Sequence, residues 1–279
     1  MKIKKRFFRG VLALSVMGVA LNLLIGCSSN SGTASTSSSK SSSLDNIRDN
    51  RKLVVGMSAD YAPYEFHTII DGKDQIIGFD VDVANEIASS LGVELEIREM
   101  DFGMLLAALQ SGKIDMVISG MSPNAEREKS VDFSDVYYKA VQSILVLDRN
   151  KNIYTSLEDL ANKKIGVQMG AIQARIAEEQ IENANITELT KVDQLITELK
   201  SGKIDAVVVE KPVAETILTT NEDLFLTEIP VKYDDGGAAI AVKKGSSDLL
   251  DEVNNIIDGL ISNGKIDEFV VNANAMVSN

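Results

Sequence analysis

Short apolar segments and longer segments with helically spaced apolar residues alternate along the chain from residue 51 onward. Val83, Ile87 and Leu91 follow one another at intervals of four positions, which places them on one face of a helix. Strands that alternate with helices of this length predict an α/β fold with largely parallel sheets. The predicted elements cover residues 52–56, 80–91, 93–97, 102–110, 114–119, 164–168, 172–181, 192–200, 205–209 and 212–218.

A six-residue pattern occurs twice in this part of the chain. Residues 110–115 read Gln-Ser-Gly-Lys-Ile-Asp, and residues 200–205, 90 positions later, read Lys-Ser-Gly-Lys-Ile-Asp. In both copies a predicted helix ends at the glycine and a predicted strand follows. The recurrence favours two similar α/β lobes, and chance recurrence of a common junction is the alternative. A shorter variant at 263–267 is predicted to separate two C-terminal helices.

The first 27 residues have the layout of an export signal. The first nine include five basic residues and no acidic one, and residues 11–25 are almost wholly apolar. This apolar run is short for a membrane span of about 20 residues but suits a secretory signal peptide. It ends in Leu-Ile-Gly-Cys, which resembles a bacterial lipobox, so Cys27 is predicted to be diacylated with chains such as palmitate. A cysteine buried in the core after a short helix is the alternative.

Residues 28–43 are predicted to form a flexible leash. Ten of these sixteen residues are serine, and none is large and apolar. A flexible chain of this length spans roughly 20–24 Å root-mean-square. The sequence therefore predicts a folded part held close to the extracellular face of the cell membrane.

The composition narrows the classes of function. The 28 basic residues of the chain less the five in the signal segment leave 23 against 41 acidic ones, a net charge of −18. Such a surface argues against nucleic acid, whose binding depends on Lys and Arg at the phosphates, and mildly favours cationic small molecules. With one cysteine and one histidine, a Cys/His zinc site is excluded, and no metal or cofactor is expected.

Several motifs together resemble the polar amino-acid binding proteins of ABC importers, the solute-binding family whose members bind histidine, arginine or glutamine. The resemblance covers nearly everything after the leash, and its motifs are residues 55–66, 78–82, 112–115, 119–122, 126–127 and 132–134. It implies a periplasmic-binding-protein-like fold, two α/β lobes that close on a ligand through a hinge. The implied first lobe is 44–140 with 235–279, the second is 143–232, and the crossings lie near 138–142 and 230–237.

The resemblance also implies the residues that bind the α-carboxylate of a free amino acid. Arg127 is expected to bind it in bidentate fashion, beside Ser122 and Gly120. Residues 122–124 are expected to start a helix, whose free N–H groups also favour an anion. The turn 168–173 of the second lobe is the matching clamp, with Gln173 at its end. It departs from relatives that carry Ser or Thr after the glycine, since Ala171 and Ile172 contribute only backbone N–H groups.

The ammonium and the side chain of the ligand are assigned in the same way. Glu210 is expected to pair with the ammonium together with Ser119 and Gly120, although relatives more often have Asp at this position. Tyr61 and Phe102 are expected to sandwich the aliphatic stem of the ligand. The residues implied for the far end of the side chain are Ser58, Asp60, Glu65 and Gln168. Some lysine- and arginine-binding relatives have Asp where this chain has Ser58. For Glu65, the alternative to ligand contact is a purely structural role.

The two acids and the amide expected around the far end of the ligand side chain, Asp60, Glu65 and Gln168, favour arginine or lysine as the ligand. Glutamine or another polar amino acid is the alternative ligand. The resemblance further implies a lipid-anchored monomer that works with the permease subunits of an ABC importer and is not an enzyme. A hydro-lyase that uses carboxylates, or a receptor or adhesin input module on the same fold, are rival functions. The sequence offers neither a nucleophile elbow nor a Walker loop, and His67 lies in a predicted turn.

Overall fold

The computed structural model describes residues 42–233 and 236–277. The predicted signal segment with Cys27, nearly all of the leash and part of the second crossing lie outside the described residues. Among the helices that are described, none is long and apolar enough to cross a membrane.

Each predicted element overlaps a helix or strand of the structure. The helices are α1 (Ser43–Asn50), α2 (Phe79–Leu91), α3 (Leu105–Gln110), α4 (Gln173–Gln180), α5 (Val192–Lys200), α6 (Lys211–Leu218), α7 (Ser247–Ser262) and α8 (Lys265–Val277). The strands are β1 (Lys52–Met57), β2 (Asp60–Tyr61), β3 (Glu65–Ile70), β4 (Lys73–Ile77), β5 (Glu94–Glu99), β6 (Met116–Val117), β7 (Val131–Phe133), β8 (Gln142–Leu147), β9 (Lys164–Gln168), β10 (Asn185–Leu189), β11 (Ala206–Glu210), β12 (Leu224–Leu226) and β13 (Ala241–Lys243). Single 3-10 turns are η1 (Phe102–Met104), η2 (Arg127–Lys129), η3 (Asp148–Asn150) and η4 (Glu158–Leu160).

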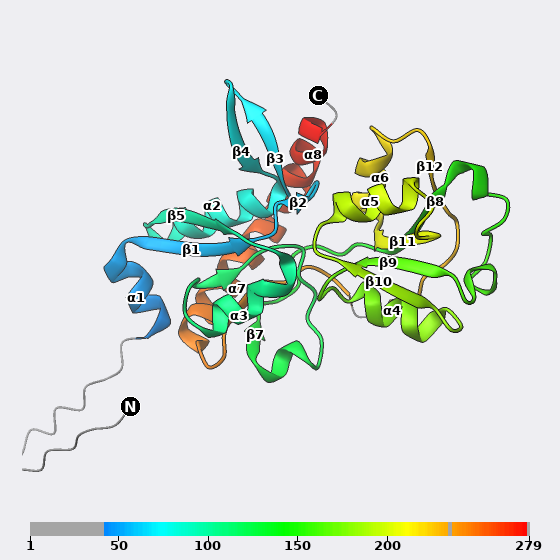
Figure 1. The fold of residues 1–279 in the computed structure, drawn as a ribbon. Helices are drawn as coiled ribbons and strands as arrows, with labels where there is room; N and C mark the ends of the chain where they lie inside the picture. The colour runs from blue at the N-terminus through cyan, green and yellow to red at the C-terminus, as the bar shows by residue number, and fades with distance from the viewer. Residues whose placement is uncertain (1–41, 234–235, 278–279) are drawn as a thin grey trace, which may run out of the picture. The chain divides into compact units, whose positions relative to one another are not determined.

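The strands form two five-stranded sheets, each the centre of one lobe (Figure 1). The first lobe has the order β5-β1-β6-β13-β7 and the second has β10-β9-β11-β8-β12. In the second lobe, α4 lies on one face of the sheet and α5 on the other, as expected when successive right-handed crossovers run in opposite directions (Figure 1). Helices α2, α7 and α8 pack against one another in the first lobe.

The prediction of largely parallel sheets is wrong for half of the strand pairs in the two five-stranded sheets. In the first lobe β1 is parallel to β5 and β6, but β13 is antiparallel to β6 and β7. In the second lobe β9 is parallel to β10 and β11, but β8 is antiparallel to β11 and β12. The antiparallel strands β8 and β13 lie next to the two crossings, where the chain arrives from the other lobe rather than from a helix of the same lobe.

A third, antiparallel sheet of β2, β3 and β4 was not predicted. His67 lies in β3 of this sheet rather than in a turn. Its ring nitrogens contact the carboxylates of Asp74 at 3.0 Å and Glu99 at 3.1 Å. His67 is therefore a surface residue of a hairpin.

The two copies of the six-residue pattern have the same structure. Both glycines adopt a left-handed conformation with φ of 72°. Each following aspartate bonds the preceding parallel strand, since Asp115 Oδ2 accepts from Val54 N at 2.8 Å and Asp205 Oδ2 from Lys164 N at 2.9 Å. Each isoleucine packs over a glycine of that strand: a Cβ on Gly56 would lie 2.4 Å from Ile114 Cδ1, and one on Gly166 would lie 2.4 Å from Ile204 Cδ1. The pattern is thus one packing unit used in both lobes.

The chain passes between the lobes along two segments that bond to each other. Tyr137 N donates to Ala238 O at 2.9 Å, and Ala238 N donates to Tyr138 O at 2.8 Å. Gly237 is required here, because a Cβ would lie 2.8 Å from Tyr138 O. The lobes therefore share a short antiparallel connection of the kind that allows a hinge motion.

Candidate functional site

The segments that follow four strands converge on one small cavity. Strands β1 and β6 belong to the first lobe and β9 and β11 to the second, and each presents its C-terminal end, the edge at which open α/β sheets bind ligands. The cavity has a volume of about 10 Å³, room for about one water molecule. Its lining consists of Tyr61, Phe102, Gly120, Ser122, Arg127, Gln168, Ala171, Ile172, Gln173 and Glu210.

Eight of the twelve ligand-contact residues expected from the sequence line this cavity. The lobes are in direct contact around it, so an amino acid fits only when they move apart. The four expected residues that do not line it are Ser58, Asp60, Glu65 and Ser119. These four lie behind the lining and bond to one another or to the opposite lobe.

Arg127 is a buried cation between the lobes. Its Nη1 donates to Ser122 O at 2.5 Å, and its Nη2 donates to Gly170 O of the second lobe at 3.0 Å. Within the described part of the chain, no carboxylate lies within ion-pair distance of this guanidinium. Burial lowers the pKa of Arg127 to about 10. A buried charge without a counter-ion is costly, so the site favours an anion here.

The segment before Arg127 differs from the prediction. Instead of a helix there is only the 3-10 turn η2, and Asn124 Oδ1 accepts from the N–H groups of Glu126 and Arg127 at 3.0 and 2.9 Å. These N–H groups are thus occupied within the turn. Ser122 Oγ, in contrast, is buried and has no hydrogen-bond partner among the described residues. The anion-binding groups of the first lobe are therefore the guanidinium and this hydroxyl.

Glu210 is the acid of the cavity, at the end of β11. Tyr64 donates its hydroxyl to Oε2, and Gln142 Nε2 lies 3.4 Å from Oε1. Gln142 in turn accepts from Gln173 Nε2 at 2.9 Å. Burial raises the pKa of Glu210 to about 7, and no cationic side chain of the described residues offsets it. A cationic group of a ligand would supply the compensating positive charge.

Aromatic rings form the walls between these charged groups. Phe102 lies beneath Arg127, with 5.4 Å from Cζ to the ring centroid. Gly120 has a left-handed conformation with φ of 52°, and a Cβ there would lie 3.3 Å from the ring of Tyr61. The backbone of Gly120 thus approaches the tyrosine closely. Ser119 does not end a strand as expected, because β6 stops at Val117.

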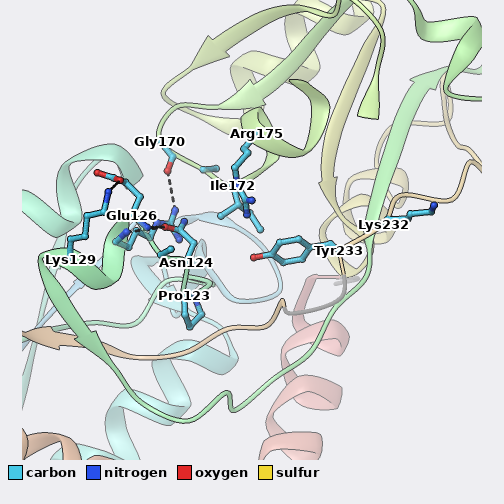
Figure 2. A pocket seen from close by; sticks show the side chains of 12 residues that line it. Pro123, Asn124, Glu126, Lys129, Gly170, Ile172, Arg175, Lys232 and Tyr233 are labelled. Carbon is cyan, nitrogen blue, oxygen red and sulfur yellow. Dashed lines mark hydrogen bonds and ion pairs between the residues drawn. The ribbon is translucent and has the colours of Figure 1, made fainter. Parts of the chain in front are cut away.

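A second cavity of about 690 Å³ lies beside the first, and Arg127, Ala171 and Ile172 line both. Figure 2 shows Arg175, Lys232 and Tyr233 on one side of it and Glu126 and Lys129 on the other. Four of its lining residues are cationic, namely Arg127, Lys129, Arg175 and Lys232. This excess of positive charge disfavours a basic ligand group on the Arg127 side, so the carboxylate end of an amino acid suits that side.

Glu65 and Asp80 form a fully buried pair of acids behind the cavity. Asp80 accepts from Gly120 N and from the Tyr137 hydroxyl, both at 2.7 Å. Glu65 accepts a hydrogen bond from the hydroxyl of Ser119. Burial raises the pKa of Asp80 to about 6 and holds that of Glu65 well above its usual range. Asp80 thus connects the Gly120 turn to Tyr137 at the start of the crossing.

The raised pKa values predict a pH dependence of stability. Acids protonated more readily in the folded state stabilise the fold at low pH, and this contribution disappears as pH rises through their folded pKa. We expect the free energy of unfolding of the ligand-free protein to fall as the pH rises from about 4, the pKa of these acids in the unfolded chain, through 7, and Glu65→Gln to reduce that slope, with the remainder due to Asp80 and Glu210. Urea unfolding at several pH values measures it. Equal slopes for the two proteins would show that the pKa of Glu65 is not raised in the folded state.

No group of three or more His, Cys, Asp or Glu side chains that could hold a metal ion occurs in residues 42–233 and 236–277. The arrangement instead offers a buried cation, a buried acid and apolar walls between two lobes.

Residues 53–272 match the family of bacterial extracellular solute-binding proteins, family 3. The chain belongs to this family. It is 38% identical over 221 residues to the arginine-binding extracellular protein ArtP of Bacillus subtilis strain 168, covering 78% of this chain and 84% of ArtP.

Two further relatives bind different amino acids according to their names. The ABC transporter glutamine-binding protein GlnH of B. subtilis is 33% identical over 259 residues, 91% of this chain and 92% of GlnH. The solved structure of the amino acid ABC transporter substrate-binding protein AbpA from Streptococcus pneumoniae, bound to L-arginine, has a TM-score of 0.81 and 40% identity. The match covers 84% of this chain and 99% of that one. This structure shares the fold of this chain.

Sequence reasoning missed several residues of the site. Asp80 stands in a motif that carried the resemblance, and Tyr64 lies in the same segment as Tyr61, so both had a signal. Gln142 and Tyr233 had none, because they reach the site from the two crossings. Their positions follow from how the lobes face each other, which no local pattern encodes.

Proposed function

We propose that this protein captures a free L-amino acid, with arginine favoured, outside the cell and delivers it to the permease subunits of an ABC importer. The observation that carries the proposal is a pair of buried charged groups in one cavity, Arg127 without an acidic partner and Glu210 without a cationic partner among residues 42–233 and 236–277. An α-carboxylate and an ammonium complement these two groups.

The two charged groups belong to different lobes, which suggests how binding drives closure. Only the closed form brings Arg127 and Glu210 to one ligand, so the ligand stabilises that form. Ser122 and Gln173 add polar contacts from either lobe, and Tyr61 and Phe102 enclose the aliphatic stem. In this scheme the carbonyls of Ser122 and Gly170 occupy the donors of Arg127 until a carboxylate replaces them.

Arginine is favoured over glutamine by the acidic composition and by the arginine-binding relatives at 38% and 40% identity. The glutamine-binding relative at 33% identity makes glutamine the second candidate. We propose no catalytic role, because the cavity is lined by binding groups and the family consists of solute-binding proteins.

The cellular arrangement is part of the same proposal. A signal segment over 1–27 with diacylated Cys27 would anchor the protein, and residues 28–43 would tether a monomer to the extracellular face. The lobes would span 44–140 with 235–279, and 143–232, joined by the two crossings.

A melting screen tests the proposal. Purified protein, stripped of bound ligand by unfolding and refolding, is heated with each of the twenty amino acids. Ligand at 1,000 times its dissociation constant adds about 4.1 kcal/mol, a shift of roughly 8–16 °C for a protein of this size. We expect the largest shift with arginine. A larger shift with glutamine would overturn the selectivity, and no shift with any amino acid would overturn the function.

A further inference from the structure

Gln168 is the last residue of β9, and it and Gln173 contribute the two side-chain amides of the described cavity lining. Its Nε2 lies 3.5 Å from Oδ1 and 3.4 Å from Oδ2 of Asp60, which belongs to the first lobe. An ionised carboxylate only accepts hydrogen bonds, so the NH₂ group of the amide must face Asp60. The amide oxygen, Oε1, is then the atom of Gln168 that remains for a ligand.

Asp60 itself does not line the cavity, and its oxygens are already engaged. Oδ1 accepts from Ser58 Oγ at 2.7 Å, and Oδ2 accepts from Val192 N of α5 at 2.8 Å. Lys191 Nζ lies 4.0 Å from Oδ1. Burial raises the pKa of Asp60 above its ordinary value, whereas these donors act in the opposite direction, favour the ionised form and satisfy its oxygens without a ligand. A direct contact between Asp60 and the cationic end of a ligand is therefore not what this geometry provides.

We propose that Asp60 is a positioning residue for selectivity: it holds the Gln168 amide so that Oε1 faces the cavity and accepts from the cationic end of a basic amino acid. This proposal rests on the proposed function, and it gives a structural basis for the preference of the protein for arginine. A fixed acceptor favours a guanidinium, which has only donors, over an isosteric ureido group, in which an oxygen replaces one nitrogen.

The test compares the dissociation constants of L-citrulline and L-arginine, which differ in this one group, by calorimetry. In Asp60→Asn the new amide can donate to or accept from Gln168, so the Gln168 amide is free to turn. We expect the dissociation constant of citrulline divided by that of arginine to fall by about tenfold, which is the scale of one hydrogen bond to a charged group. Gln168→Met removes the acceptor and is expected to lower the ratio by a similar factor.

The double variant Asp60→Asn with Gln168→Met separates direct from indirect action. If Asp60 acts through Gln168, adding Asp60→Asn to the Gln168→Met variant does not lower the ratio of the two dissociation constants any further. A further fall would mean that Asp60 contacts the ligand itself, and would overturn the proposal.

Lys191→Met is the matched control. It removes the ion pairs of Lys191 with Asp60, Glu99 and Asp101, at 4.0, 3.5 and 3.7 Å, and leaves Asp60 next to Gln168. We expect it to weaken both ligands by the same factor, because it loosens only the contact between the lobes. If Asp60→Asn also weakened the binding of both ligands by the same factor, the proposal would be overturned.

The remaining outcomes are also decisive. If Asp60→Asn does not fold, an unchanged ratio in Gln168→Met overturns the proposal and a fall supports it. If the unaltered protein binds no amino acid, this inference and the proposed function both fail, and if it binds glutamine but neither arginine nor lysine, this inference and the preference for arginine fail. If it binds arginine with an unchanged ratio in the variants, only this inference fails.

Discussion

Replacing Arg127 with alanine is expected to weaken L-arginine binding by about 2–5 kcal/mol, roughly 30- to 4,000-fold. The carboxylate of the ligand would then be buried opposite Ser122 and backbone groups, without a cation. The ligand-free variant should lose little stability, since the buried guanidinium has no acidic partner among the described residues. Isothermal titration calorimetry gives the affinity, and thermal unfolding gives the stability.

Lys129→Ala is the matched control for this experiment. Lys129 lies two residues away, is exposed, and pairs with the equally exposed Glu126. Exposed ion pairs contribute little, so this variant should bind arginine like the unaltered protein. If Arg127→Ala also bound arginine with unchanged affinity, Arg127 would not be the carboxylate-binding residue.

Glu210→Gln is expected to have an effect of similar size together with a changed pH profile. The pKa of Glu210 is raised to about 7 by burial, and a bound ammonium would lower it again. Binding therefore releases a proton below pH 7, and the affinity for arginine should fall by about tenfold for each pH unit below that value. The variant should bind about 2–5 kcal/mol more weakly at pH 8 and show a flatter profile.

Titrations between pH 5.5 and 8.5 test this prediction. Glu215→Gln changes an exposed acid on α6 that pairs with Lys211, and it should keep both the affinity and the pH profile of the unaltered protein. A profile for Glu210→Gln as steep as that of the unaltered protein would assign the titration to another group, of which Asp80 is the nearest candidate.

The elements with a strong local signal could be predicted from the sequence. The apolar face of Val83, Ile87 and Leu91 gave α2, and the repeated Ser-Gly-Lys-Ile-Asp gave the same junction in both lobes. The prediction of parallel pairing was wrong for β8 and β13, the two strands that the chain enters from the other lobe. Nothing near β13 tells that it pairs with β6, more than 120 positions earlier, in the opposite direction.

The resemblance named most of the residues that line the cavity, but it did not give the contacts among them. Tyr61 and Glu210 end strands β2 and β11, and Arg127 lies in the turn η2. Asp60 was expected to contact the far end of the ligand because the resemblance assigns it there. The structure instead places it against Gln168 and Val192 of the other lobe, and this contact depends on how the lobes meet.

The repeated junction also bears on how such a protein evolves. The Gly-Lys-Ile-Asp units precede β6 and β11, whereas Gly120, which follows β6, and Glu210, the last residue of β11, line the cavity at the opposite end. Residues that secure folding and residues of the candidate site are therefore physically separate along each strand. Mutation and selection can change the ligand repertoire at one end while the repeated junction at the other stays intact.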